Sequence, residues 1–210
     1  MALDIHITSL SAGHQLLVHN LHVHCPPGQV TTLMGDSGSG KSSVLAAIAG
    51  TLDAAVQFDG TIVLNDDSIT TWPCAQRRIG VLFQDDLLFA HMTIRENLLF
   101  AVPAGPAAQR QAAVQQALQE LGFSDMAHRS PNTLSGGQRA RVSLLRTLLA
   151  KPRALLLDEP FSKLDAALRQ QFREFVFAHV RKYRLPTLLV THDLADVADS
   201  QRCIHVSTPC

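Results

Sequence analysis

A glycine-rich run, Gly35–Ser42 (GDSGSGKS), most constrains how this 210-residue chain can fold. It follows a strand-like run at 30–34 and precedes a helix-like run at 44–49, the setting that a phosphate-binding G-x-x-x-x-G-K-[ST] pattern requires. The glycines let backbone N–H groups point inward, and the following helix presents a positive N-terminal end. Lys41 is then expected to reach the β- and γ-phosphates, and the Ser42 hydroxyl is expected on Mg²⁺. The run predicts a site for a nucleoside triphosphate.

Composition limits the remaining function classes. The length suits one α/β domain with a small insertion, and a hydrophobic content of 46% argues against intrinsic disorder. Eighteen Lys and Arg balance eighteen Asp and Glu, so no general basic field points to nucleic acid. Apolar runs such as 154–157 are strand-sized, and the N-terminus lacks a signal-peptide layout. We expect a soluble intracellular protein that docks on a membrane partner.

The cysteines and the N-terminal histidines are weak candidates for a metal site. The chain has four cysteines, none in a C-x-x-C pair, so neither a zinc site nor a disulfide framework is favoured: Cys25, Cys74, Cys203 and Cys210. His19, His22 and His24 precede Cys25, but in a strand His22 and His24 share one face and Cys25 takes the other. A half-exposed strand is therefore favoured over a metal site.

Hydrophobic periodicity predicts the order of the elements. We expect antiparallel strands between residues 3 and 23, strands at 60–64, 77–84, 154–157 and 187–190, and helices at 107–121, 142–149, 164–179 and 193–199. Strands that alternate with helices around a phosphate loop predict a mostly parallel sheet, an α/β fold, after an N-terminal antiparallel β part. The sequence predicts one domain, 1–210, with a helical subdomain inserted at about 87–150.

Two carboxylates, Asp158 and Glu159, end the buried-type strand at 154–157. Buried carboxylates need a cation or hydrogen-bond partners, and beside a triphosphate the obvious cation is Mg²⁺. We assign Asp158 to Mg²⁺ and Glu159 to the attacking water as general base. The alternative is a strand-end acidic pair that faces solvent.

A second anion site is predicted at Leu134–Gln138 (LSGGQ), just before the helix at 142–149. Ser135 can cap that helix, and Gly136 and Gly137 leave N–H groups unobstructed at its positive end. The alternative is a capping serine with a flexible start.

These motifs together resemble the ATP-binding subunit of an ABC transporter, over nearly the whole chain from Leu3 to Val206. The family motifs occur in order: Walker A at Gly35–Ser42, the Q-loop glutamine Gln84, the signature Leu134–Gln138, Walker B ending at Asp158, the catalytic Glu159, the D-loop Ser162–Asp165 and the switch histidine His192. The runs 82–89 and 92–97 are similar to bacterial importer subunits, most of all to the thiamine, iron and polyamine group.

The resemblance implies a head-to-tail homodimer that holds two ATP molecules, each between Walker A of one chain and the signature of the other. It implies catalytic roles for Glu159, His192 and Gln84, and Mg²⁺ held by Ser42, Gln84 and Asp158. The implied ATP contacts are Gly35, Asp36, Ser37, Gly38, Ser39, Gly40, Lys41, Ser42, Ser43, Ser135, Gly136, Gly137, Gln138 and Asp165.

The resemblance also implies partners and a location. Transmembrane permease subunits would be moved by the opening and closing of the dimer, and a periplasmic or extracellular protein would deliver the substrate. Nucleic acid is not an expected partner. The implied location is peripheral, on the cytoplasmic face of the inner membrane.

The chain departs from the family pattern in its N-terminal strands and its D-loop. The family stacks an aromatic residue on adenine near position Ala12, but no Tyr, Phe or Trp precedes Phe58, and His14 is only a partial substitute. Lys163 stands where the D-loop often has a small residue, and Asp36 adds a negative charge to Walker A. The chain ends shortly after the strand at 187–190, so no C-terminal regulatory domain is expected.

Three other classes of protein share parts of this motif pattern. An ABC ATPase that acts on nucleic acid or ribosomes usually has paired cassettes or a long coiled coil, which this chain lacks. A P-loop phosphotransferase would share Gly35–Ser42 but has no use for Leu134–Gln138, Gln84 and His192. A single-cassette ABC ATPase for lipid extraction, export or mechanical work at the membrane is the main alternative.

Overall fold

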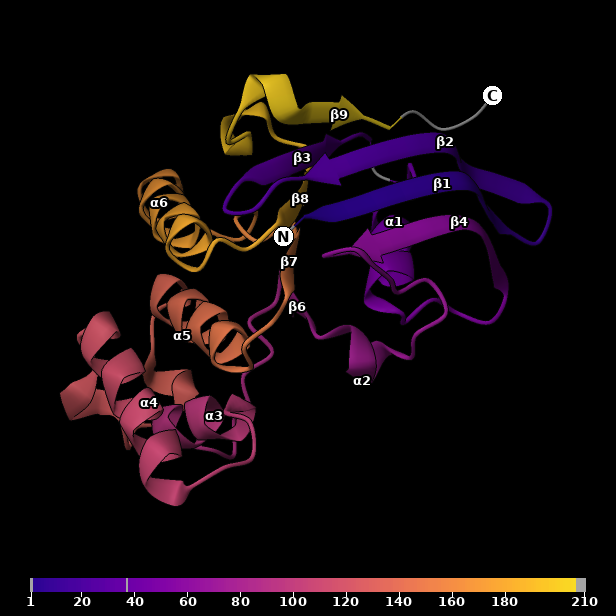
Figure 1. The fold of residues 1–210 in the computed structure, drawn as a ribbon. Helices are drawn as coiled ribbons and strands as arrows, with labels where there is room; N and C mark the ends of the chain where they lie inside the picture. Colours follow the sequence, from indigo (N-terminus) through magenta and orange to yellow (C-terminus); the bar gives the residue numbers. More distant parts are fainter. Residues whose placement is uncertain (1, 37, 207–210) are drawn as a thin grey trace. The chain divides into compact units, whose positions relative to one another are not determined.

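Two sheets organise the chain in this computed structural model, which describes residues 2–36 and 38–206 (Figure 1). One sheet is antiparallel, with the order β2-β1-β4-β5, and the other has five strands in the order β6-β7-β8-β3-β9. The strands are β1 (Leu3–Ala12), β2 (Gln15–Cys25), β3 (Val30–Met34), β4 (Val56–Leu64), β5 (Asp67–Ser68), β6 (Ile79–Leu82), β7 (Ala154–Asp158), β8 (Thr187–Thr191) and β9 (Cys203–His205). The predicted α/β class with an antiparallel N-terminal part is confirmed.

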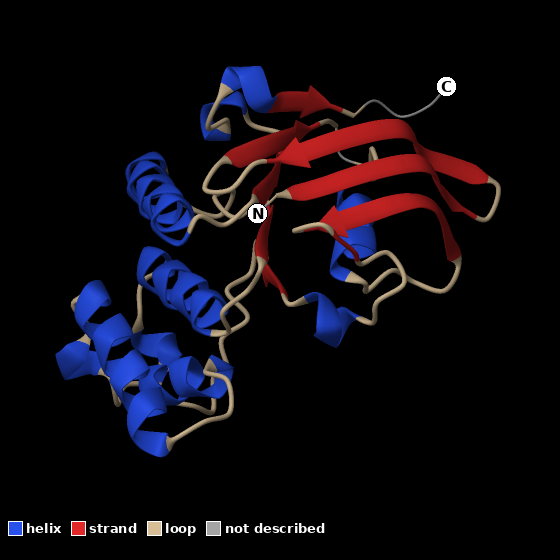
Figure 2. Cartoon of the chain, in the orientation of Figure 1, coloured by secondary structure: helices blue, strands red, loops and turns tan. Residues whose placement is uncertain are grey.

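The chain forms two compact units. The sheet unit contains residues 1–81, 153–159 and 177–210, and the helical unit contains residues 82–152 and 160–176. Every residue from 83 to 152 lies in a helix, a turn or a loop (Figure 2). The helices are α1 (Lys41–Ala49), α2 (Cys74–Arg77), α3 (Ile94–Ala101), α4 (Ala107–Leu121), α5 (Gly136–Leu149) and α6 (Ala166–Tyr183), which starts in the helical unit and ends in the sheet unit.

The five-stranded sheet brings three loops to one edge. Strand β8 lies parallel to β3 on one side and to β7 on the other, with Thr191 opposite Met34 and Val190 opposite Asp158. All residues of β3 and β8 are buried, as expected of strands covered on both faces. Because the strands run in the same direction, the loops that follow β3, β7 and β8 leave from the same edge.

The antiparallel sheet has one buried and one solvated face. In β1 the side chains of Leu3, Ile5 and Ile7 are fully buried, whereas His6 on the alternate face is exposed. Strand β2 repeats this alternation. The expected antiparallel strands between residues 3 and 23 are confirmed, and the apolar face belongs to the larger hydrophobic core.

Local capping signals set the helix boundaries well. Helix α4 starts after Pro106 and ends at Gly122, whose φ of +70° stops the helix, so the predicted helix at 107–121 is confirmed. Helix α3, which periodicity did not predict, begins with a capping box between Thr93 and Glu96. Among the helices of the described residues, none is both long and apolar enough to cross a membrane.

Two predicted elements differ from the structure. The helix expected at 193–199 is wrong: the chain forms two 3-10 turns, Leu194–Asp196 and Ser200–Arg202. Each turn starts at an aspartate whose carboxylate accepts a hydrogen bond two residues on, and Val197 between them is extended, which stops a continuous helix. The strand expected at 77–84 is restricted to β6, because Arg77 ends α2 and Arg78 has φ of +52°.

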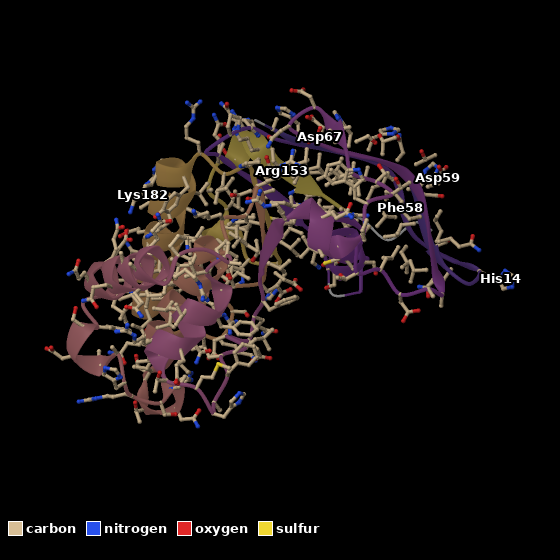
Figure 3. The ribbon with its side chains drawn as sticks, turned by 60° about the horizontal axis from the view of Figure 1, so that its bottom comes forward. His14, Phe58, Asp59, Asp67, Arg153 and Lys182 are labelled. Carbon is tan, nitrogen blue, oxygen red and sulfur yellow. The ribbon has the colours of Figure 1, made fainter. Side chains whose placement is uncertain are left out.

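Arg153, just before β7, connects the two sheets. Its guanidinium donates to the Asp67 carboxylate over 2.5 Å and to the Leu64 carbonyl over 3.1 Å, and it stacks over the Trp72 ring. Figure 3 shows Arg153 and Asp67 side by side. Both sheets are thus held together at the end of β4, remote in sequence from β7.

Candidate active site

The glycine loop between β3 and α1 is the first component of the site. Gly38 and Gly40 have φ of +84° and +85°, a conformation that glycine adopts without strain. A Cβ on Gly40 would lie 2.9 Å from the Val18 side chain, so β2 closes against the loop here. The loop therefore requires glycine for its geometry, as predicted from the motif.

Lys41 lies over this loop. Its side chain is only 6% exposed, and its ammonium donates to the carbonyl oxygens of Gly35 over 2.7 Å and of Asp36 over 2.6 Å. The Ser39 hydroxyl is also buried in the loop and has no hydrogen-bond partner among the described residues. A buried cation and a buried hydroxyl donor in one backbone turn are the groups that a phosphate can use.

The end of β7 supplies the acid and base groups. The Glu159 carboxylate lies 3.2 Å from His192 Nδ1, and Glu159 itself has φ of +46°, an uncommon conformation for a non-glycine residue. The pKa of Asp158 is raised, mainly by burial and further by the charge of Glu159, while Lys41 acts in the opposite direction. A cation placed here would relieve the cost of keeping Asp158 ionised.

Lys41, Glu159 and two glycines of the loop line a hollow in the sheet unit. Its volume is about 350 Å³, and it is lined by Leu17, Gly38, Gly40, Lys41, Ser42, Ser43 and Glu159. The hollow combines a cation, backbone N–H groups, a helix N-terminus and a carboxylate with a histidine partner. This combination can bind an anionic ester and activate water beside it. Ser37, predicted to contact ATP, lies outside the described residues.

A second group of predicted residues lies in the helical unit, at the start of α5. Ser135 caps this helix: its hydroxyl accepts from the Gln138 N–H over 3.3 Å, and the Gln138 side chain accepts from the Ser135 N–H over 2.9 Å. A Cβ on Gly137 would lie 3.3 Å from Leu168, so even alanine is tight at this position. The predicted cap is confirmed.

Gln84 and the D-loop also lie in the helical unit. Gln84 lines a small cavity of about 130 Å³ whose lining includes Gly136 and Lys163. The Lys163 ammonium forms an ion pair with Asp85, next to Gln84, and the Asp165 carboxylate accepts from the Leu168 N–H over 3.0 Å. The predicted site residues thus form two groups, one within each unit.

Sequence reasoning missed two features of the sheet unit. Leu17 lines the hollow, whereas Ala12, where an adenine-stacking residue was expected, pairs with Gln15 at the end of the β1–β2 hairpin. No periodicity identifies Leu17, because its position depends on how β2 lies against Gly40.

The second missed feature holds the backbone on both sides of His192. The Thr191 hydroxyl donates to the buried Asp196 carboxylate over 2.9 Å and accepts from the Asp193 N–H over 3.1 Å. The only sequence signal is a threonine immediately before the histidine and an aspartate four residues after it.

A parallel sheet with a glycine loop and a strand-end carboxylate pair at the same edge defines a P-loop NTPase. The family described as ABC transporter matches residues 18–162. The chain belongs to this family and is an ABC ATP-binding protein with ATPase activity.

Two kinds of relative support the assignment. The chain is 50% identical over 196 residues to the uncharacterized ABC transporter ATP-binding protein YnjD of Escherichia coli (strain K12). The aligned residues cover 91% of this chain and 89% of that protein. It is 44% identical over 186 residues to the sulfate/thiosulfate import ATP-binding protein CysA of Mycobacterium tuberculosis (strain ATCC 25618 / H37Rv), 86% of this chain and 52% of the relative. The CysA of Synechocystis sp. (strain ATCC 27184 / PCC 6803 / Kazusa) is 37% identical over 195 residues, 92% of this chain and 54% of the relative. The chain spans about half the length of these CysA proteins.

Proposed function

We propose that this chain is the ATP-hydrolysing subunit of a bacterial ABC importer and works as a head-to-tail homodimer on membrane permease subunits. The observation that carries the proposal is the 3.2 Å approach of His192 to Glu159, beside the hollow that Lys41 and Ser42 also line. A carboxylate that only stabilised the fold would not need an exposed histidine and a phosphate loop as neighbours.

Each side chain of the hollow has a role in this proposal. Lys41 and the loop N–H groups bind the β- and γ-phosphates, and Glu159 accepts a proton from the attacking water. His192 orients that water and contacts the γ-phosphate. The oxygen donors of Ser42 and Asp158 suit Mg²⁺, which when bound would neutralise phosphate charge, and Gln84 stays a predicted third ligand.

We assign the apolar contact with the nucleobase to Leu17. Its side chain borders the loop from β2, and the chain has no aromatic residue before Phe58. An aliphatic side chain discriminates less between nucleobases than a stacked aromatic ring does. We therefore expect weak selectivity for adenine over guanine at this site.

Dimerisation completes the site. One phosphate loop cannot by itself enclose a γ-phosphate. The start of α5 in a second copy supplies a capped helix N-terminus with the N–H groups of Gly136 and Gly137. Ser135, Gln138 and Asp165 of that copy complete the ATP contacts.

Partners and direction of transport rest on two supports. Relatives that are 44% and 37% identical are named as import proteins for sulfate and thiosulfate. The helical unit exposes large apolar side chains, with Phe100 at 64% and Leu87 at 55%, and a groove of about 320 Å³ runs beside Phe100. Exposed apolar patches of this kind mark protein contacts, and permease helices are the proposed occupants.

The remaining assignments follow from import. A substrate-binding protein outside the membrane delivers the solute, and the chain works at the cytoplasmic face of the inner membrane without entering it. The similarity to thiamine, iron and polyamine importers stays a prediction, because the named import relatives carry sulfate and thiosulfate.

Hydrolysis by the purified chain tests the catalytic assignment. Glu159→Gln should lower kcat by about 10²- to 10⁴-fold with little change in ATP binding, because the amide cannot accept the proton. The matched control is Glu174→Gln, a change at an exposed position of α6. Unchanged turnover in Glu159→Gln would show that another group is the base.

A further inference from the structure

Helix α5 of the helical unit (Figure 1) carries a charged side chain, Arg139, that the proposed chemistry does not use. Its backbone N–H donates to the Ser135 carbonyl, so Arg139 lies one turn into the helix. We propose that Arg139 is a positioning residue for the shared ATP site. Its ion pair with Asp86 fixes the start of α5 and so determines how well that start meets the nucleotide of the opposing copy. This inference rests on the proposed head-to-tail dimer.

The Arg139 guanidinium joins two segments that are far apart in the sequence. Its Nη1 donates to the Leu134 carbonyl over 2.7 Å, and its Nε donates to the Asp86 carboxylate over 2.8 Å. Leu134 immediately precedes the cap Ser135, and its side chain is buried in the core of the helical unit. The side chains of Arg139 and Asp86 are only 35% and 30% exposed, so water and salt screen this pair less than a fully exposed one.

The turn that contains Asp86 is also held by the middle of α5. The Asp86 carbonyl accepts from the buried Ser143 hydroxyl over 2.8 Å. The Arg146 guanidinium donates to the carbonyl of Leu87 over 2.8 Å and to that of Asp86 over 3.2 Å. These bonds fix the backbone of the turn without involving Arg139. The ion pair between Arg139 and the Asp86 side chain therefore adds a separate link, from this turn to the start of the helix.

The same turn presents an apolar side chain to solvent. Leu87 is 55% exposed and has φ of +47°, a conformation that is uncommon for a branched residue and persists where neighbouring contacts fix it. Leu87 belongs to the exposed apolar side chains for which permease helices are the proposed occupants. Asp86 precedes it directly. A displacement of the turn by a partner at Leu87 would thus reach the Leu134 carbonyl through one side chain, Arg139.

The position of the Leu134 carbonyl matters because the helix starts immediately after it. The first N–H groups of a helix have no partner within the helix, and here they belong to Gly136 and Gly137. A hydrogen bond to an anion weakens steeply when its donor is misaligned. By holding the Leu134 carbonyl, Arg139 keeps these N–H groups in one orientation. It acts through them and requires no contact of its own with ATP.

ATP-driven dimerisation of the full-length Glu159→Gln protein tests this role. The measured quantity is the ATP concentration, with Mg²⁺ present, at which half of the chains elute as dimer. We expect Arg139→Gln and Asp86→Asn each to raise it by about five- to tenfold, as for the loss of one charged hydrogen bond. The double variant should need no more ATP than Arg139→Gln alone, because both changes remove the same pair. Arg139→Lys keeps the charge without the fork that spans two acceptors and should give an intermediate value.

Arg146→Gln is the matched control, because Arg146 holds the carbonyls of the same turn from about two turns further along α5. It should lower the thermal midpoint of the nucleotide-free protein at least as much as Arg139→Gln does, but change the ATP requirement by less than about twofold. Equal effects of the two substitutions on the ATP requirement would overturn the positioning role, since a general loosening of the helical unit would explain both.

Two further outcomes separate this inference from the proposed function. If Glu159→Gln forms a dimer whose ATP requirement is unchanged by Arg139→Gln and by Asp86→Asn, the positioning role is wrong and the shared site stands. If Glu159→Gln stays monomeric at saturating ATP, the shared site itself is wrong, and the role of Arg139 is overturned with it.

Discussion

At the residue scale, the end of β7 carries two carboxylates with different surroundings. Glu159 has a histidine partner, whereas Asp158 is partly withdrawn from water beside a second negative charge. Burial and the charge of Glu159 both raise the pKa of Asp158, and Lys41 lowers it only in part. Ionised Asp158 therefore lowers the stability of the fold, and a bound cation would remove this cost.

Asp158→Asn should stabilise the apo chain while it abolishes activity that depends on Mg²⁺. An acid whose pKa is raised on folding lowers stability at every pH above the raised pKa, and this cost disappears as the pH falls toward the unfolded value of about 3.8. We expect the thermal midpoint of Asp158→Asn to exceed that of the wild type at pH 7 by only on the order of 1–3 °C, since the group is only partly buried.

The stability difference should narrow steadily when both proteins are melted at lower pH without nucleotide. Asp59→Asn, at an exposed position of β4, is the control and should show no such trend. A variant of Asp158 that melts below the wild type at pH 7 would mean that the carboxylate has stabilising partners.

Thr191 is expected to position His192. Thr191→Val keeps the shape of the side chain but removes the bonds to Asp196 and Asp193 that fix the backbone around the histidine. We expect kcat to fall by about tenfold with KM for ATP nearly unchanged, because the lost contact acts on the histidine and not on the loop. Thr191→Ser retains the hydroxyl and should restore most of kcat; equal losses in both variants would contradict a hydrogen-bonded role.

At the element scale, α1 has its two ends fixed by different means. Its N-terminus follows Gly40, and its C-terminus ends at Gly50 with φ of +77°. The buried Arg77 guanidinium donates to the carbonyls of Ala47 over 2.6 Å and of Ile48 over 2.8 Å, close to the negative end of the helix. Burial lowers the pKa of Arg77, yet the group stays charged because four carbonyl oxygens accept its hydrogens.

Arg77→Ala should therefore destabilise the sheet unit by about 3 kcal/mol, because the carbonyls at the end of α1 lose a charged partner inside the protein. Urea unfolding followed by circular dichroism measures this change. Arg77→Lys keeps the charge but cannot reach four acceptors, and we expect about half of the loss. Arg129→Ala, at an exposed position, is the control; an equal effect there would remove the argument from burial.

At the scale of the whole molecule, local signals predicted elements better than they predicted contacts. Pro106 and Gly122 delimit α4 in the sequence itself, so its boundaries were predictable. Strand β9 is only Cys203–His205 and exists because it pairs with β3, far away in sequence. The phosphate loop, the carboxylate pair and His192 were predictable as motifs. Leu17 and the pairing of His6 with His22 were not, because both depend on the register of β2.

The proposed dimerisation is also tested on the whole molecule. With ATP, Glu159→Gln should elute from a size-exclusion column as a dimer, because the closed state is no longer released by hydrolysis. Adding Ser135→Arg should return it to a monomer, since a bulky cation at the start of α5 would block the opposing phosphate loop. A monomer at saturating ATP in the single variant would contradict a shared site.

The contacts of Lys41 have a consequence for how nucleotide is bound and released. Its ammonium already donates to two carbonyl oxygens of its own loop, so in the proposed ATP site an arriving phosphate would replace these oxygens as its hydrogen-bond partner. The contribution of Lys41 to the free energy of binding is then the difference between its bonds to phosphate and its bonds to the loop carbonyls. The reverse exchange of partners can occur after the phosphate is cleaved. When the nucleotide leaves, the Lys41 ammonium would regain its two carbonyl acceptors, so product release would not leave a buried cation without a partner. This favours repeated turnover.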